Sequence, residues 1–214
     1  MTPRFFILLS IGLAGTCELM AQQPAARAAR LEERAAQTRE IVYYLRQPET
    51  GTFDLSHDYT ETKPGTDKYL NVVRAGSTVA NPSAVDLDTG EKLDTRILKG
   101  ALITQAALDI GEPVKPATEV VVISFPAVRQ GQSLRLRISE TYTDTARYKV
   151  LNGELIWNRA FGRPTNAVVL PVGWALTNSS IPAAVTELPD GRTRLDFINS
   201  RPDEVNVLIT ARKK

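Results

Sequence analysis

Hydrophobic and polar positions alternate with a period of two through much of the chain after residue 40. The alternation is clearest in segments 52–60 and 133–143. Because successive side chains of a strand point to opposite faces of a sheet, each segment is predicted to be a strand with one buried face. Segment 119–125 (EVVVISF) is continuously apolar, which predicts a strand buried on both faces.

Turn residues separate the β-type segments and favour antiparallel pairing. The turns are Asn-Gly at 152–153, Pro-Asp-Gly at 189–191 and Asp-Thr-Gly at 88–90. Asn-Gly and Asp-Gly accept the positive φ angles that tight hairpins need. Each turn is therefore predicted to join two neighbouring antiparallel strands.

Shorter β-rich segments complete the pattern at 68–74, 95–104 and 205–210, and Gly100 is predicted to form a bulge in the second of them. Only segment 105–108 (QAAL) has a locally helical pattern. Strands at this spacing, with few helices between them, are typical of a sandwich. The sequence predicts an all-β fold, an antiparallel β-sandwich of about ten strands.

The N-terminal part of the chain has a different pattern. A positively charged start, the apolar run FFILLSIGLA and small residues up to Ala21 predict a signal peptide over residues 1–21. Residues 22–40 are rich in Ala, Arg and Glu, which predicts a helical or flexible linker before a single β-sandwich domain at 41–214. We expect a periplasmic or secreted protein; the alternative is lipid anchoring to the outer or inner membrane through Cys17.

The composition limits the kinds of functional site that the chain can form more than it limits the fold. The 214 residues carry a net charge of +2, so no strong positive field attracts nucleic acid. The single Cys cannot form an internal disulfide, and the single His57, expected on the inward face of a strand, cannot build a multi-His metal site. We expect no catalytic residue, no metal site and no cofactor, although paired carboxylates stay open as catalytic groups.

The most distinctive segment is WNRAFGRPTNAVVLPVGW, which carries Trp157, Arg159, Phe161, Arg163 and Trp174. Clustered aromatic and arginine side chains can bind a carbohydrate, a peptide or a protein partner. These five residues form the predicted binding site. The alternative interpretation is a long connection between strands whose Trp side chains cap the core.

Segment 120–142 runs as a strand ending at Phe125, a turn containing Gly131, and a Leu-x-Leu-x-Ile strand followed by Tyr142. This segment resembles the N-terminal β-sandwich domain of secreted zinc peptidases of the aminopeptidase N type. The zinc-binding motif and glutamate of those enzymes are absent from this chain, so no catalytic residue is carried over. The resemblance implies a non-catalytic β-sandwich.

Together these patterns predict an exported, non-catalytic binding or structural module of the bacterial cell envelope, with a protein or glycan partner. One alternative is a carboxylate-based hydrolase acting on glycans, which needs a pocket holding two or more acidic groups with perturbed pKa values. Another is an accessory subunit that pairs with its partner by strand addition, which needs an open sheet edge formed by a strand without Pro or Lys.

Overall fold

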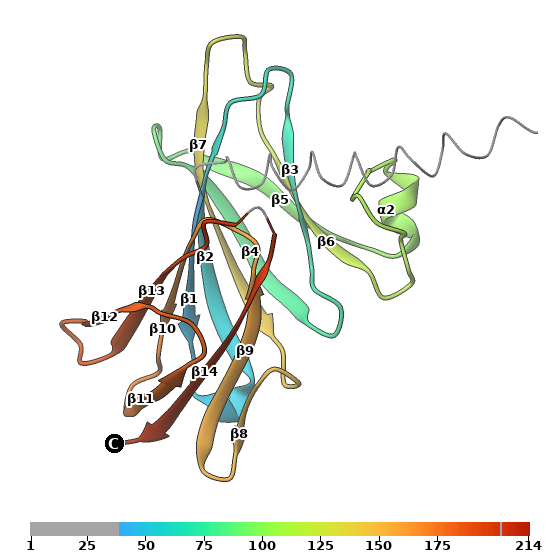
Figure 1. Ribbon diagram of the computed structural model, residues 1–214. Coiled ribbons are helices and arrows are strands. Elements are labelled where there is room, and N and C mark those ends of the chain that lie inside the picture. Colours follow the sequence, from blue (N-terminus) through green and yellow to red (C-terminus); the bar gives the residue numbers. More distant parts are fainter. Residues whose placement is uncertain (1–38, 202) are drawn as a thin grey trace, which may run out of the picture.

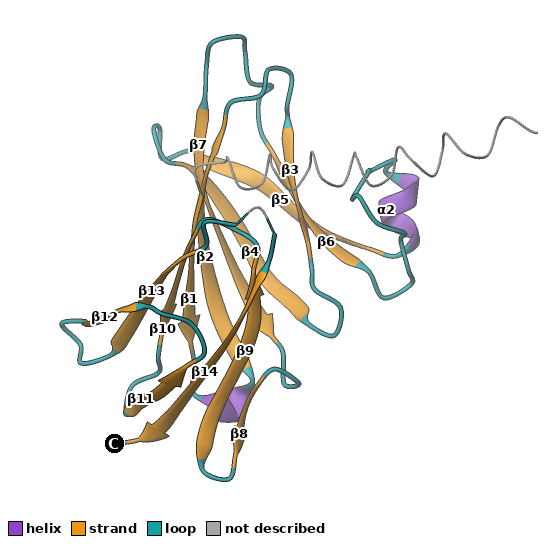
Figure 2. Ribbon diagram, in the orientation of Figure 1, coloured by secondary structure: helices purple, strands orange, loops and turns teal. Residues whose placement is uncertain are grey.

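The computed structural model describes residues 39–201 and 203–214 (Figure 1). Strands dominate this part of the chain, and the predicted all-β sandwich is confirmed (Figure 2). The predicted signal peptide, most of the predicted linker and Cys17 lie outside the described residues. The first described strand begins at Arg39, slightly before the predicted start of the domain at residue 41.

The described residues form fourteen strands rather than about ten, in a ten-stranded and a four-stranded sheet. In spatial order, the larger sheet contains β12 (Ala184–Glu187), β13 (Thr193–Ile198), β10 (Thr165–Val169), β1 (Arg39–Leu45), β2 (Thr52–Glu61), β7 (Leu134–Thr143), β4 (Thr78–Asp86), β5 (Lys92–Lys99), β6 (Glu119–Ser124) and β3 (Lys68–Val72). The smaller sheet contains β11 (Trp174–Ser179), β14 (Val205–Lys213), β9 (Glu154–Phe161) and β8 (Tyr148–Leu151).

The three predicted hairpin turns are confirmed. The turn at 152–153 joins β8 to β9, the turn at 189–191 joins β12 to β13, and the turn at 88–90 joins β4 to β5. Asn152 and Gly153 both have positive φ, as a tight turn between adjacent strand residues requires. Pairing is antiparallel except between β1 and β10, which run parallel. This parallel pair is possible because no hairpin joins the two strands: β10 follows β9 of the small sheet and enters the large sheet beside β1.

The small sheet packs against one half of the large sheet. A single hydrophobic core contains side chains from both, including Tyr43 and Phe53 of the large sheet and Trp157 and Ile209 of the small one. At the other end of the large sheet, α2 (Ala101–Gln105) covers β5, β6 and β3, with its Ile103 buried in a second cluster. The helix lies beside these three strands in Figure 1.

The predicted strand buried on both faces is confirmed in β6. Its residues 120–123 are fully buried, because the main core covers one face and the cluster around α2 covers the other. No helix among the described residues has the length and apolar character needed to cross a lipid bilayer.

Two local predictions around Gly100 were wrong. The strand ends at Lys99 instead of continuing to residue 104, and the helix covers 101–105 instead of 105–108. Gly100 has φ +52° and immediately precedes the helix, so its positive φ turns the chain out of the sheet instead of forming a bulge within a strand.

Candidate binding site

The aromatic residues of the predicted site are core residues. Trp157, Phe161 and Trp174 are only 1%, 1% and 2% exposed. Trp157 and Phe161 lie on the inward face of β9, with ring centroids 5.3 and 5.7 Å from that of Tyr43. These rings therefore contribute to packing and form no surface on which a partner could stack.

The structure brings together Trp157, Arg159 and Phe161 but places the other two predicted residues elsewhere. Trp174 starts β11, where its Nε1 donates to Gln47 Oε1 at 3.1 Å. Arg163 follows β9, and its carbonyl accepts a hydrogen bond from the Asn166 side chain at 2.8 Å. The segment is also no long connection, since it contains the end of β9 and all of β10.

Arg159 is the predicted site residue with the most unusual environment. Its guanidinium is buried against the rings of Tyr43, Phe53 and Tyr142, with centroids 5.3, 5.0 and 5.5 Å away. Its Nη1 lies 4.0 Å from Asp144 Oδ2. Ring faces and a carboxylate both attract a cation, so this interior position is electrostatically favourable for arginine.

Asp144 is the buried carboxylate on which the surrounding loops converge. It follows β7, and its Oδ2 accepts hydrogen bonds from Ser77 Oγ at 2.9 Å and from Arg147 Nη1 at 3.1 Å. Its Oδ1 accepts from the Arg147 backbone at 3.2 Å. Asp144 therefore ties the β3–β4 loop, the β7–β8 turn and, through Arg159, the small sheet together.

Arg74, in the loop after β3, makes only long polar contacts and, unlike Arg159, is partly exposed. Its Nη2 lies 3.5 Å from the Ala160 carbonyl and 3.9 Å from Glu204 Oε2, and its side chain is 31% exposed. Burial lowers the pKa of Arg74; the positive charges of Arg159 and Arg147 lower it further, and Glu204 opposes them. A lowered pKa means that the positive charge of Arg74 is incompletely compensated.

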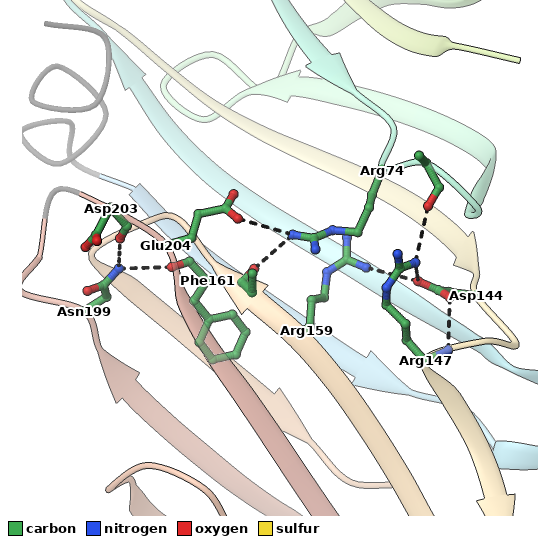
Figure 3. A network of polar contacts seen from close by, with 10 residues as sticks. Arg74, Asp144, Arg147, Arg159, Phe161, Asn199, Asp203 and Glu204 are labelled. Carbon is green, nitrogen blue, oxygen red and sulfur yellow. Dashed lines mark hydrogen bonds and ion pairs between the residues drawn. The ribbon is translucent and has the colours of Figure 1, made fainter. Parts of the chain in front are cut away.

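We refer to Arg74, Arg147, Arg159, Asp144 and Glu204 as the arginine cluster (Figure 3). Figure 3 shows the heads of Arg74 and Arg159 next to each other, with Glu204 at one end and Asp144 at the other. Three guanidinium groups thus share two carboxylates. These five residues together carry one excess positive charge, and Arg74 is the partly exposed arginine at the end of the cluster near Glu204.

A pocket of about 240 Å³ opens beside the cluster. One wall is the turn at 73–77, and the other comes from segment 112–118, which contributes Glu112 and Lys115. Pockets that hold whole drug-sized ligands start at roughly 300 Å³. This pocket is therefore smaller than those that hold a whole drug-sized ligand.

Glu140 is a second buried carboxyl group near Arg159. Its Oε2 accepts hydrogen bonds from Asn71 Nδ2 at 2.6 Å and from the Tyr142 hydroxyl at 3.0 Å. Burial raises the pKa of Glu140, while these two hydrogen bonds and the charge of Arg159 act in the opposite direction. The raised pKa shows that burial outweighs the polar contacts.

The two carboxyl groups that line the second pocket do not meet. A shallow pocket of about 220 Å³ on the large sheet has Asp54 and Glu140 in its lining. Asp54 is paired across the sheet with Thr141, so its side chain shares the outward face with that residue, whereas Glu140 points inward. Burial raises the pKa of Asp54, but hydrogen bonds from Arg46 and Thr141 outweigh it and leave the pKa lowered. The two carboxyl groups lie on opposite faces of one sheet and cannot act on the same bond.

His57 lies on the inward face of β2, as expected. Its side chain is fully buried, and its Nε2 has no hydrogen-bond partner. Among the described residues, no group of three or more His, Cys, Asp or Glu side chains is arranged to hold a metal ion.

Sequence reasoning missed Arg74, Asp144 and Arg147. Asp144 and Arg147 are separated by three positions in a turn, a spacing at which an acidic side chain can bond to the following basic residue. That local signal was available. No such local signal pointed to Arg74, because the residues that its side chain contacts, Ala160 and Glu204, are distant in sequence.

No protein family model matches the chain, and no curated protein sequence matches it. Solved structures with a similar fold were found. A two-domain M1 zinc metallopeptidase bound to L-tryptophan has a TM-score of 0.46 at 14% identity, over 80% of this chain and 41% of that one. An M1 zinc metallopeptidase from Deinococcus radiodurans has a TM-score of 0.45 at 14% identity, with the same coverage. This chain therefore spans about two-fifths of the length of those peptidases, and its weak resemblance to them is confirmed for the fold alone.

Proposed function

We propose that this protein is a non-catalytic β-sandwich binding module whose arginine cluster recognises a carboxylate group on a protein or glycan partner. The observation that carries the proposal is the position of Arg74. Its side chain is partly exposed, makes only long polar contacts, lies next to a second guanidinium and contributes to the lining of a small pocket.

The chemistry of arginine supports an anionic ligand. A guanidinium presents donors in a planar fork that matches the two oxygens of a carboxylate. Arg74 lacks such a bidentate partner, unlike Arg137, which binds Asp58 through two bonds of 2.6 and 2.7 Å. A carboxylate at Arg74 would also offset the repulsion from Arg159. Because the site is partly open to water, binding should weaken as salt is added.

The test uses two carboxylate probes, a hexaglutamate peptide and a galacturonic acid oligosaccharide. Binding to the full exported chain is measured by calorimetry at low and high salt. We expect salt-sensitive binding of at least one probe, and an affinity about tenfold lower for Arg74→Gln. The two probes separate a protein partner from a glycan partner.

Arg135→Gln is the matched control. It also removes one positive charge, but from an exposed arginine of β7 that pairs with Asp88 and does not line the pocket. Its affinity should equal that of the wild type. Equal losses in both variants would indicate a non-specific effect of net charge, and absence of binding of either probe to the wild type would refute the proposal.

We also propose that the chain is exported to the cell envelope, on the strength of its charged start and the apolar run that follows. The natural protein isolated from its cells should begin at Gln22. Mass spectrometry of its N-terminus tests this. A lipid-modified N-terminal Cys17 would replace soluble export with a membrane anchor, and an intact Met1 would contradict export.

A second candidate function, strand addition, is favoured by the edge strand β12. This strand ends the ten-stranded sheet, contains neither Pro nor Lys, and exposes all four of its residues. Hydrogen exchange, measured on a complex with a protein partner from the cell envelope, distinguishes strand addition from binding at the arginine cluster. Protection of 184–187 supports strand addition, whereas protection of 73–77 and 112–118 supports the arginine cluster.

A further inference from the structure

The second pocket, of about 220 Å³, lies on the outward face of the ten-stranded sheet and shares no lining residue with the pocket beside the arginine cluster. Tyr44 of β1, Asp54 of β2 and Thr141 of β7 form one cross-strand row. Ser56 and Ser139 are paired in the next row of the same face, since each lies two positions further along its strand. All five residues line the pocket and are partly exposed. A ligand can therefore reach them from solvent.

A bulge in β4 completes the pocket. Two residues of β4, Asn81 and Pro82, lie opposite a single residue of β7. Among the described residues, Asn81 is one of three non-glycine residues with a positive φ, at +51°. A hydrogen bond of 3.0 Å from Thr95 Oγ1 to the Pro82 carbonyl holds the bulge in place. Bulges redirect side chains, and here Asn81 is part of the pocket lining.

The pocket presents polar groups that the protein itself does not use. Among the described residues, the side chains of Ser56, Asn81 and Ser139 have no hydrogen-bond partner within the protein. A hydroxyl and an amide can each both donate and accept. These three side chains come from three different strands and meet at one concave place, so a single ligand can bond to all of them.

Asp54 adds an acceptor whose position is fixed. Its Oδ1 accepts from Arg46 Nη2 at 2.7 Å and from Thr141 Oγ1 at 2.8 Å. Its Oδ2 accepts only from Arg46 Nε, at 2.9 Å, and can accept one more hydrogen bond. Arg46 also compensates the charge of Asp54, and no basic residue lines the pocket. The lining therefore favours a ligand that is polar but uncharged.

We propose that this pocket binds a neutral sugar unit. Sugar hydroxyls both donate and accept, so they match the free side chains of Ser56, Asn81 and Ser139. Asp54 Oδ2 accepts from a further hydroxyl. The apolar C–H face of the sugar ring packs on Tyr44, the one aromatic side chain in the lining. This site is separate from the arginine cluster, and the inference does not depend on the proposed function.

Nuclear magnetic resonance on the ¹⁵N-labelled full exported chain tests the proposal. The chain is titrated with the methyl glycosides of glucose, galactose and mannose, with N-acetylglucosamine, and separately with galacturonic acid. We expect at least one neutral sugar to shift the backbone signals of 54–56, 81 and 139–141 saturably. Added salt should leave its affinity unchanged, because the ligand has no charge to screen. Galacturonic acid should bind there about tenfold more weakly, since no cation in the lining offsets its carboxylate.

Two matched serine variants assign the response. Ser139→Ala removes a hydroxyl from the pocket, whereas Ser83→Ala removes one from its exposed cross-strand neighbour on β4, which does not line the pocket. Ser139→Ala should weaken binding about fivefold, as the loss of one neutral hydrogen bond implies, and Ser83→Ala should bind as the wild type does. Asn81→Gly keeps a residue suited to positive φ but lacks the amide, so it should also weaken binding.

Three results would overturn the proposal. The first is that no neutral sugar shifts the signals of the lining residues. The second is that galacturonic acid binds at these residues as tightly as the neutral sugars do. The third is that Ser139→Ala and Ser83→Ala bind the sugar equally well. Urea midpoints equal to that of the wild type check that both serine variants fold.

Discussion

Arg159 and Asp144 form the most informative pair at the scale of single residues. Alternation along segment 154–161 is enough to place Trp157, Arg159 and Phe161 on one face of a strand. It cannot show which face the second sheet covers, and an arginine among aromatic residues is therefore assigned to the surface. In the structure, ring contacts and Asp144 compensate its charge inside the sandwich.

Asp144→Asn is expected to destabilise the protein. The amide keeps the size of the side chain and can still accept a bond from Ser77, but Arg147 and Arg159 lose their shared carboxylate. Leaving a buried charge unpaired costs about 3 kcal/mol. Urea unfolding monitored by circular dichroism measures the loss. Asp203→Asn, at an exposed pair, should leave the midpoint unchanged. An Asp144→Asn midpoint equal to that of the wild type would show that Asp144 contributes nothing.

Glu140 should make stability depend on pH. Burial raises its folded pKa above the ordinary value of 4.5, so the folded state holds the proton more tightly than the unfolded state. This contribution is fully present below pH 4.5 and is lost as pH rises through the folded pKa. Relative to Glu140→Gln, the wild type should therefore lose stability with rising pH. Urea midpoints of both proteins from acid to neutral pH test this, and parallel curves would contradict it.

At the scale of elements, alternation and turn chemistry were sufficient to predict the strands and hairpins whose structure depends on residues close together in the sequence. Strands β2 and β7 and the 152–153 hairpin follow from their own residues. The parallel pairing of β1 with β10 does not, because it joins distant segments and depends on how the two sheets pack. Around Gly100, the pattern of Ile97, Leu98, Leu102 and Ile103 fits a strand, and the backbone conformation of one glycine decides against it.

Gly100→Ala is expected to destabilise the junction between β5 and α2. A Cβ there would lie 2.8 Å from the Pro116 carbonyl oxygen, and φ is +52°. Gly131→Ala is the control, since it has a similar positive φ of +75° but nothing within 4 Å. Positive φ alone costs about 1 kcal/mol, and the clash should add a similar amount at Gly100. Urea unfolding compares the two variants. Equal losses would mean that the Pro116 contact is relieved at no cost.

At the scale of the whole molecule, the two sheets share one core, and this determines how the protein unfolds. Aromatic side chains from β1, β2 and β9 contact one another across the interface. Neither sheet can therefore lose its partner without exposing large apolar surfaces. The hydrophobic composition is enough to predict a packed core. It cannot predict that one core is continuous across the two sheets, because that depends on long-range packing.

We therefore expect a single cooperative transition, which two separate probes can test. Both Trp residues lie in the small sheet, so their fluorescence reports on that sheet, and the His57 ring signal reports on the large one. Their urea transitions should coincide, because loss of the small sheet exposes the core of the large one. Ile209→Val, a buried change in β14, should lower the free energy of unfolding reported by both probes equally, by about 1 kcal/mol. A Trp transition that precedes the His57 transition, or that alone responds to Ile209→Val, would show that the sheets unfold independently.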